Sequence, residues 1–229
     1  MIDTIKLHIP IQDQTLIQQL KGTLTRFRKE NLKDGKLEWE FFTANIEVGS
    51  YSRKITIKST DNPSGFFVEL SVPKYIKGNN VEMLHPRALL PALEALYKEI
   101  CEHMEYELPH ISTWPVYRLD VCYNWLFETK EQTEYVMDFI QRIDYPRKQR
   151  YEYQTSVMYK GSAYTIKFYL KGPEFRKNDF KKLPYERATF LQQWANRIVR
   201  FEVNFKRAYL ESHFGLSKVY AKDVADDDV

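Results

Sequence analysis

Residues 198–206 read IVRFEVNFK, a stretch in which apolar and polar side chains alternate from end to end. Successive side chains of a strand point to opposite faces, so this alternation predicts a strand with one apolar and one polar face. The same pattern recurs in three other stretches: FFVELSV at 66–72, YRLDVCYNW at 117–125 and YTIKFYLK at 164–171. Together the four stretches predict an antiparallel sheet that is apolar on one face and polar on the other.

Between the strands, apolar residues recur at helical spacing. This spacing predicts helices at 13–28, 86–104, 129–143 and 185–195. Strands and helices do not alternate regularly as they do in βαβ units. The predicted fold class is therefore α+β, with a mainly antiparallel central sheet and helices packed on one face. The recurring strand–strand–helix grouping is compatible with two similar halves.

No linker rich in Gly, Ser or Pro divides the chain. We therefore expect a single domain over residues 1–220. The tail over 221–229 contains three successive Asp residues and is expected to be frayed and disordered. Two further elements are expected in the first half, a strand at 2–9 and a hairpin at 37–59 with its turn at 49–50.

Composition excludes several classes of protein. Of the 229 residues, 28% are charged and 43% are hydrophobic, which excludes disordered, collagen-like and coiled-coil chains. No apolar run reaches the roughly 18 residues that a membrane helix needs, and the N-terminus does not read as a signal peptide. We therefore expect a cytoplasmic protein without membrane association. Its two cysteines, Cys101 and Cys122, are too few for a disulfide framework or a cysteine zinc site.

Net charge and aromatic content leave the partner open. The net charge of +3 permits a nucleic-acid partner without requiring one. Aromatic residues make up 15% of the chain, and most of those in the four strands, such as Tyr123 and Trp125, fall on apolar faces and are expected to be core. Tyr169 differs, because it falls on the polar face of 164–171.

The polar faces of the four strands mix acidic and basic side chains. Such a mixture is also typical of the solvent-exposed face of an antiparallel sheet. If the strands are neighbours, however, the carboxylates of Glu69, Asp120 and Glu202 converge enough to hold Mg²⁺ or Mn²⁺ through oxygen ligands. Basic side chains can contact DNA phosphates as point charges or as bidentate forks. The candidates for such contacts are Arg118, Lys167, Arg200 and Lys206 on the strands and Lys160 in the turn before 164–171.

A tyrosine beside a metal ion and a phosphate-binding rim suggests one reaction. The hydroxyl of tyrosine can attack a phosphodiester and form a covalent phosphotyrosine, while the metal polarises the scissile phosphate. A phenol, with an ordinary pKa of about 10, needs a metal or a neighbouring cation to react at neutral pH. Lys171 lies two residues from Tyr169 on the same strand face. The candidate catalytic residues are therefore Tyr169 and Lys171.

Other common catalytic motifs do not occur in the sequence. The five histidines include no HxH, HxxxH or HExxH spacing, so a histidine zinc site is not expected. There is no GxGxxG stretch, no Walker lysine loop and no GxSxG stretch. Dinucleotide binding, P-loop nucleotide hydrolysis and serine hydrolase chemistry are therefore not predicted.

Five segments resemble a known family and occur in its order. The family comprises the replication initiation proteins of filamentous phages and related plasmids, the gene II family. Together the segments span residues 1 to about 215. They are MIDTIKLHIP at the start, VPKYIKGNNV at 72–81, YRLDVCYN at 117–124, KFYLKGPEF at 167–175 and RFEVNFKRAYL at 200–210.

This resemblance implies a fold like that of the HUH and Rep endonucleases and the activity of a rolling-circle initiator. Such proteins nick one strand of a double-stranded origin, stay joined to its 5′ phosphate through tyrosine, and rejoin the displaced single strand. By position, the family's nucleophile corresponds to Tyr169 and its acidic motif residues to Asp120 and Glu202, whereas Glu69 comes from the strand pattern alone. A host helicase and a single-strand-binding protein are implied partners. The oligomeric state is not readable from the sequence.

The chain also departs from these relatives. It lacks the histidine–hydrophobic–histidine pair of the HUH endonucleases, so any metal would be held by carboxylates or by one isolated histidine. Full-length family members continue beyond the position of Val229 into a further C-terminal region. Two alternatives stay open: a non-catalytic DNA-binding replication regulator on the same fold, and a structural or protein-interaction domain. Cleavage of origin DNA separates the initiator from both alternatives.

Overall fold

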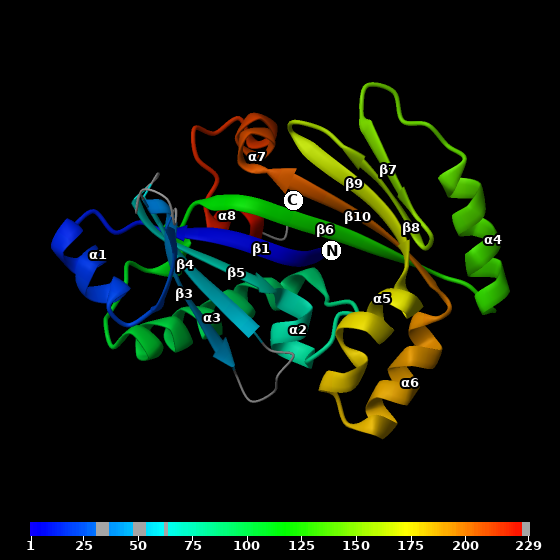
Figure 1. Ribbon diagram of the computed structural model, residues 1–229, viewed down its shortest axis with the longest axis horizontal. Coiled ribbons are helices and arrows are strands. Elements are labelled where there is room, and N and C mark those ends of the chain that lie inside the picture. Colours follow the sequence, from blue (N-terminus) through cyan, green and yellow to red (C-terminus); the bar gives the residue numbers. More distant parts are fainter. Residues whose placement is uncertain (31–36, 48–53, 62–63, 226–229) are drawn as a thin grey trace.

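The computed structural model describes residues 1–30, 37–47, 54–61 and 64–225. Within these residues one long twisted sheet has the strand order β2-β3-β4-β5-β1-β6-β10-β9-β8-β7, and all neighbouring strands are antiparallel (Figure 1). The strands are β1 (Ile2–Ile9), β2 (Thr25–Glu30), β3 (Leu37–Glu47), β4 (Lys54–Asp61), β5 (Ser64–Ser71), β6 (Val116–Leu126), β7 (Gln149–Tyr153), β8 (Ser156–Lys160), β9 (Tyr164–Leu170) and β10 (Ile198–Lys206).

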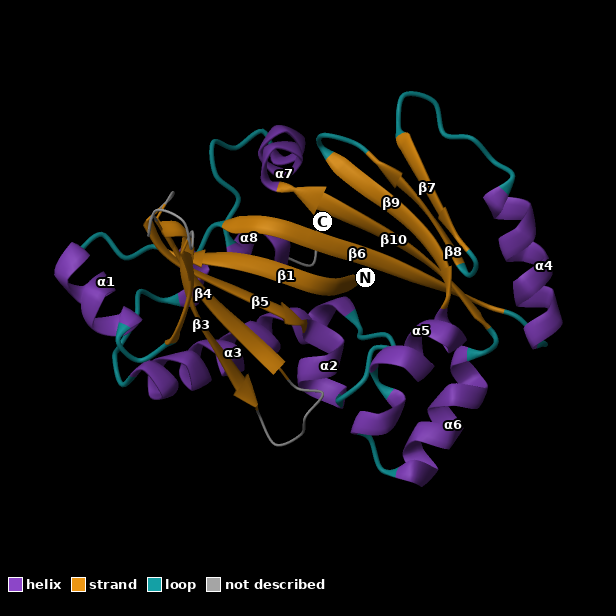
Figure 2. Cartoon of the chain, viewed as in Figure 1, coloured by secondary structure: helices purple, strands orange, loops and turns teal. Residues whose placement is uncertain are grey.

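The described helices follow or connect these strands (Figure 2). They are α1 (Gln14–Lys21), α2 (Val72–Lys77), α3 (Leu89–Met104), α4 (Lys130–Gln141), α5 (Lys171–Asn178), α6 (Tyr185–Ala195), α7 (Arg207–Phe214) and α8 (Ala221–Ala225). The predicted α+β class with a mainly antiparallel sheet is confirmed. No helix of the described part of the chain is long and apolar enough to cross a membrane.

The register of the central strands brings their polar positions onto one face. Residues directly opposite each other in an antiparallel pair share a face of the sheet. Asn204 of β10 lies opposite Asp120 of β6 on one side and Thr165 of β9 on the other. Along β10, Glu202 lies opposite Lys167. The predicted polar faces of these three strands therefore form one continuous surface.

The apolar face is covered by helices over most of its length. In the first half, Leu93 and Leu96 of α3 share a cluster of buried side chains with Ile5 and Leu7 of β1. In the second half, α4 packs on β8, β9 and β10. Helices α5 and α6 lie elsewhere, at one end of the polar face, where they form a separate small cluster with Ile198. These two helices position the site described below.

One part of the apolar face is exposed, contrary to the expectation from the sequence. Tyr123 and Trp125 are 55% and 37% exposed, and the ring of Trp125 stacks on Phe168 and Phe201. Helix α4 packs on β8, β9 and β10. It therefore leaves the C-terminal end of β6 accessible to solvent, and the two aromatic side chains are surface residues, not core.

Two expected boundaries are also wrong. The helix predicted over 13–28 ends at Lys21 with Gly22 as its C-cap, and β2 begins at Thr25 where the sequence changes to a two-residue period. The tail predicted from 221 folds as far as residue 225, because Ala221 and Val224 of α8 join the core. Residues 226–229 and the predicted turn at 49–50 lie outside the described residues.

Gly172 allows α5 to approach α6 closely. A Cβ at this position would clash with Oδ1 of Asn196, the C-cap residue of α6, and would lie 3.0 Å from its Cα. We expect Gly172→Ala to lower the free energy of unfolding by about 1–3 kcal/mol, because the backbone of α6 must shift to make room. Urea denaturation measures this change.

A matched control for this substitution is Gly22→Ala. Gly22 has a φ of −64°, and its Cβ would meet a single backbone oxygen at 3.0 Å. This change is expected to cost less than about 1 kcal/mol. Equal stability of Gly172→Ala and the unchanged protein would show that the two helices are not held in this close contact.

Candidate active site

A cavity of about 600 Å³ opens on the polar face between the β7–β8 hairpin and α5. Strands β1, β6, β9 and β10 form its floor, and Asn80 from the segment after α2 reaches into it. Most side chains that carry the argument below line this cavity. They are Arg118, Asp120, Lys167, Tyr169, Glu174 and Glu202.

Tyr169 is the next-to-last residue of β9 and presents its hydroxyl to a carboxylate. The phenol donates a hydrogen bond to Oε2 of Glu202 over 3.0 Å. The two residues lie on adjacent strands in diagonal positions, since Tyr169 is opposite Arg200 and Glu202 is opposite Lys167. Burial raises the pKa of Tyr169 well above 10, with Glu202 adding to this effect and Arg200 opposing it.

The other carboxylate oxygen of Glu202 accepts a hydrogen bond from Lys167. The ammonium group of Lys167 donates to Oε1 of Glu202 over 2.8 Å, and the Glu202 side chain is only 8% exposed. Both carboxylate oxygens of Glu202 therefore have partners, one phenolic and one cationic.

Asp120 is tied to a guanidinium group. Arg118 donates from Nε to Oδ1 of Asp120 over 2.9 Å and makes a second contact, from Nη2, to Oδ2. The same Arg118 donates from Nη1 to Glu69 over 3.1 Å, and Asn204 donates to Asp120 from the other side. Burial raises the pKa of Asp120, and the contacts with Arg118 oppose this shift.

The three-carboxylate metal site predicted from the sequence is not formed. Arg118 stands between Glu69 and Asp120, and Lys167 holds Glu202. Residues 1–30, 37–47, 54–61 and 64–225 contain no cluster of three His, Cys, Asp or Glu side chains that could hold a metal ion. The carboxylates of this face are paired with cations of the chain itself, and the donor set does not fit a divalent ion.

Lys171 lies inside the protein, next to the site. Its side chain is 0% exposed, and its ammonium group donates to Oδ1 of Asn80 over 2.8 Å and to the carboxylate of Glu174. Burial lowers the pKa of Lys171. The ammonium group is 6.0 Å from the ring centroid of Tyr169. Lys171 can therefore act on Tyr169 through its charge, and it does not face the cavity as a phosphate contact.

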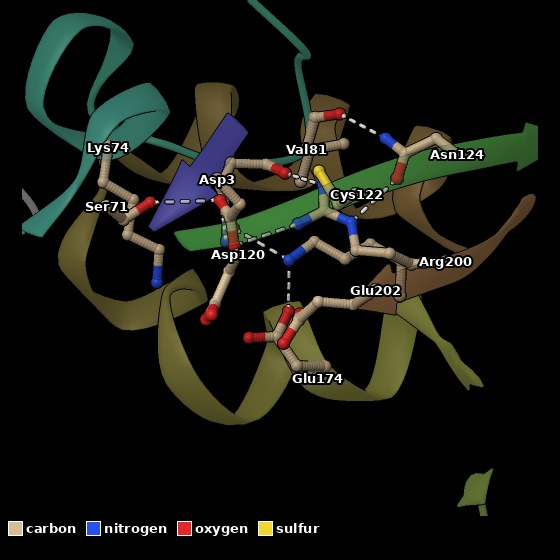
Figure 3. A network of polar contacts seen from close by, with 12 residues as sticks. Asp3, Ser71, Lys74, Val81, Asp120, Cys122, Asn124, Glu174, Arg200 and Glu202 are labelled. Carbon is tan, nitrogen blue, oxygen red and sulfur yellow. Dashed lines mark hydrogen bonds and ion pairs between the residues drawn. The ribbon is translucent and has the colours of Figure 1, made fainter. Parts of the chain in front are cut away.

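Arg200 is also buried, at 1% exposure, although the sequence predicts a DNA contact. It donates from Nε to Asn124 over 2.8 Å and from Nη2 to the carbonyl of Asn80, while Nη1 has no hydrogen-bond acceptor and lies 3.8 Å from Asp3 (Figure 3). The α5–α6 unit and the 79–81 segment cover this end of the polar face. Arg200 therefore cannot reach a phosphate in this conformation.

The remaining basic candidates lie along the same face but away from Tyr169. Lys160 is exposed and lies opposite Thr165, and Lys206 lies opposite Arg118 and donates to the carbonyl of Gly161 over 3.0 Å. Of the three lysines, Lys167 lines the cavity, whereas Lys160 and Lys206 do not.

Sequence reasoning missed Asn80 and Asp3. Asn80 accepts from both buried cations, through its side chain from Lys171 and through its carbonyl from Arg200. It belongs to the KGNN turn, where Gly78 adopts a left-handed conformation that ends α2. This turn was the available signal, because a glycine followed by two asparagines marks a tight, hydrogen-bonded loop.

Comparisons with known proteins bear on this site. The family model for the N-terminal region of the gene II replication-associated protein matches residues 1–224. A solved structure of a rolling circle replication initiator protein from Geobacillus stearothermophilus is similar with 13% sequence identity and a TM-score of 0.38, and the alignment covers 99% of this chain and 78% of that chain. No curated protein matches the chain. The family match extends over almost the whole chain.

Proposed function

The chain belongs to the gene II family of replication-associated proteins, whose N-terminal region it matches, and from this membership we propose that it initiates rolling-circle DNA replication. In this proposal it nicks one strand of a double-stranded origin, stays joined to the 5′ phosphate through Tyr169, and later rejoins the displaced single strand. The observation that carries the proposal is the hydroxyl of Tyr169, which lies in a polar cavity and is hydrogen-bonded to a carboxylate.

The reaction is an exchange of phosphodiester bonds. The oxygen of Tyr169 attacks the scissile phosphorus, the P–O bond to the Tyr169 oxygen forms, and the P–O3′ bond breaks to leave a 3′ hydroxyl. Because one phosphodiester replaces another, the reverse attack of a 3′ hydroxyl on the phosphotyrosine rejoins a strand. A single tyrosine site therefore accounts for both nicking and joining.

Cations at the cavity supply electrostatic stabilisation. The side chains of Arg118 and Lys167 are 32% and 34% exposed and line the cavity, so they are accessible to a phosphate. Preorganised donors aimed at developing negative charge are a major source of rate enhancement in phosphoryl transfer. Lys171 and Arg200 add fixed positive charge behind Tyr169 without contacting the DNA.

The proposed reaction uses the side chains of the chain itself. A Mg²⁺ or Mn²⁺ ion at Asp120, Glu202 and Glu69, as the sequence predicts, would have to displace Arg118 and Lys167 from their carboxylates. Addition of EDTA tests this point, because a reaction that depends on the described side chains alone continues in its presence.

Origin DNA is the partner that this function requires, as duplex before the nick and as single strand afterwards. Unwinding and protection of the displaced strand need a helicase and a single-strand-binding protein, which we propose as host partners in the cytoplasm.

A second candidate is a DNA-binding replication regulator without catalysis. The observation that favours it is the half-buried position of the Tyr169 hydroxyl, which is hydrogen-bonded to Glu202 and whose surroundings raise its pKa and so oppose its ionisation. Both candidates bind DNA in a salt-sensitive manner, so binding does not separate them.

Cleavage of a supercoiled plasmid that carries the protein's own replication origin separates the two. The initiator converts the supercoiled form to the open circle and leaves an SDS-resistant protein–DNA adduct. A protein that shifts this plasmid in a gel but yields neither open circle nor adduct, with Mg²⁺, with Mn²⁺ or with EDTA, is the regulator.

A further inference from the structure

The position of Glu202 on the polar face indicates a role other than the one that the sequence predicts for it. The sequence predicts Glu202 as a metal ligand, but its Oε2 atom accepts the hydrogen bond of the Tyr169 hydroxyl over 3.0 Å. This distance lies within the range in which a general base takes a proton. We propose that Glu202 is the catalytic residue that accepts the phenolic proton of Tyr169 during strand cleavage. This inference rests on the proposed function.

The need for a proton acceptor follows from the surroundings of Tyr169. The ordinary pKa of a phenol is about 10, so almost no phenolate exists at neutral pH. The nucleophile must therefore lose its proton as it attacks. Of the carboxylates in the described part of the chain, Glu202 is the one hydrogen-bonded to this hydroxyl, whereas Asp120 is engaged by Arg118 and Glu174 by Lys171.

The charged groups around Glu202 fix its orientation. Lys167, from the neighbouring strand β9, donates to Oε1 and leaves Oε2 to the phenol. Arg118 and Asp120 of β6 pair with each other on the other side of β10. Among the described residues, Tyr169 is the one side chain that donates a hydrogen bond to Oε2. The Oε2 atom of Glu202 is therefore placed to accept the proton of the Tyr169 hydroxyl.

The proton balance closes over the two half-reactions. In cleavage the proton moves from Tyr169 to Glu202 as the P–O bond to tyrosine forms, and the departing 3′ oxygen gains a proton from the ammonium group of Lys167, which then regains one from Glu202. In joining, each transfer runs in reverse, and Tyr169 leaves as a neutral phenol. The chain needs no external acid or base for either direction.

The test is the rate of adduct formation in a single turnover with Glu202→Gln. An amide keeps the size and one of the two acceptor oxygens but cannot take a proton, so we expect a fall of roughly 10²- to 10⁴-fold with DNA affinity unchanged within about twofold. The matched control is Glu69→Gln, which makes the same change on the same face and is expected to lower the rate less than about tenfold.

A second readout separates proton transfer from a structural effect. Replacement of Tyr169 by 3,5-difluorotyrosine makes the phenol more acidic, so the Glu202→Gln variant should regain more rate from fluorination than the unchanged protein does. The unchanged protein should also show a normal solvent deuterium isotope effect on adduct formation. The isotope measurement does not depend on whether the variant folds.

Two results would overturn the inference. One is an unchanged rate in Glu202→Gln. The other is a fall in the rate of adduct formation that fluorination of Tyr169 does not change and that added Mn²⁺ reverses in both Glu202→Gln and Glu69→Gln. This second result would identify Glu202 as a metal ligand. Tyr169→Phe, assayed in parallel, distinguishes these outcomes from failure of the proposed function, because an adduct in that variant would remove Tyr169 itself from the reaction.

Discussion

Replacement of Tyr169 by phenylalanine is expected to abolish the covalent protein–DNA adduct, with a loss of at least roughly 10⁴-fold in its rate of formation. Phenylalanine keeps the ring and removes only the oxygen that forms the bond to phosphorus. Within the described part of the chain the hydroxyl makes one hydrogen bond, to Glu202, so the fold and the DNA affinity should change little. Denaturing gel analysis with a labelled origin fragment measures the adduct.

Tyr159 and Tyr164 provide the controls for this substitution. Both lie on the opposite face of the sheet, where the hydroxyl of Tyr159 donates to the carbonyl of Ile143 and that of Tyr164 lies 3.4 Å from Tyr145. Their phenylalanine variants should form the adduct at the normal rate. An adduct that persists in Tyr169→Phe and disappears in Tyr159→Phe or Tyr164→Phe would move the nucleophile to that residue.

The second large effect is expected for Arg200→Met. Loss of the guanidinium leaves the carbonyl of Asn80 and the side chain of Asn124 without their donor and removes the cation near Asp3, which is only 5% exposed. Removing one partner of such a buried charge network costs about 3–5 kcal/mol. Urea denaturation at pH 7 measures the loss in the free energy of unfolding.

Arg118→Met is the matched control for Arg200→Met. Its side chain is 32% exposed but its partner Asp120 is only 2% exposed, so this variant is also expected to lose stability, and it should in addition bind DNA more weakly and with a smaller salt dependence. The reverse pattern, with Arg200→Met stable and weakened in DNA binding, would restore the role of Arg200 as a phosphate contact.

The two faces of the sheet could be predicted from the sequence because alternation with a period of two is a local property. The stretch IVRFEVNFK indicates on its own that Arg200 and Glu202 share a face. It does not indicate which strand lies beside it. The pairing of β10 with both β6 and β9 decides that Glu202 meets Lys167 and Tyr169, and this pairing depends on long-range packing.

The burial of two cations could not be predicted from the same pattern. A lysine at the polar end of an alternating stretch is usually solvent-exposed, so the pattern places Lys171 on the open strand face. In the structure the strand ends at Leu170, Lys171 begins α5, and Asn80, from a segment about ninety residues earlier in the sequence, covers it. The same segment covers Arg200. Only the tertiary arrangement brings these groups together.

The described residues do not gather the three predicted carboxylates into a metal site, for a related reason. Three carboxylates on neighbouring strands predict a cation between them, and the structure does place a cation there. It is the guanidinium of Arg118, between Glu69 and Asp120. The sequence pattern places Arg118 on the same face, but it does not indicate that the side chain pairs with both carboxylates, because that depends on the arrangement of β5, β1 and β6.

The most direct test is to locate the DNA on the protein. After reaction with an origin oligonucleotide and nuclease trimming, trypsin releases residues 168–171 as the peptide FYLK, in which Tyr169 is the single tyrosine. We predict that mass spectrometry finds the nucleotide 5′ phosphate on this peptide. A phosphonucleotide on 161–167 or 151–160 instead, or an unmodified FYLK peptide from an adduct-bearing protein, would contradict the account.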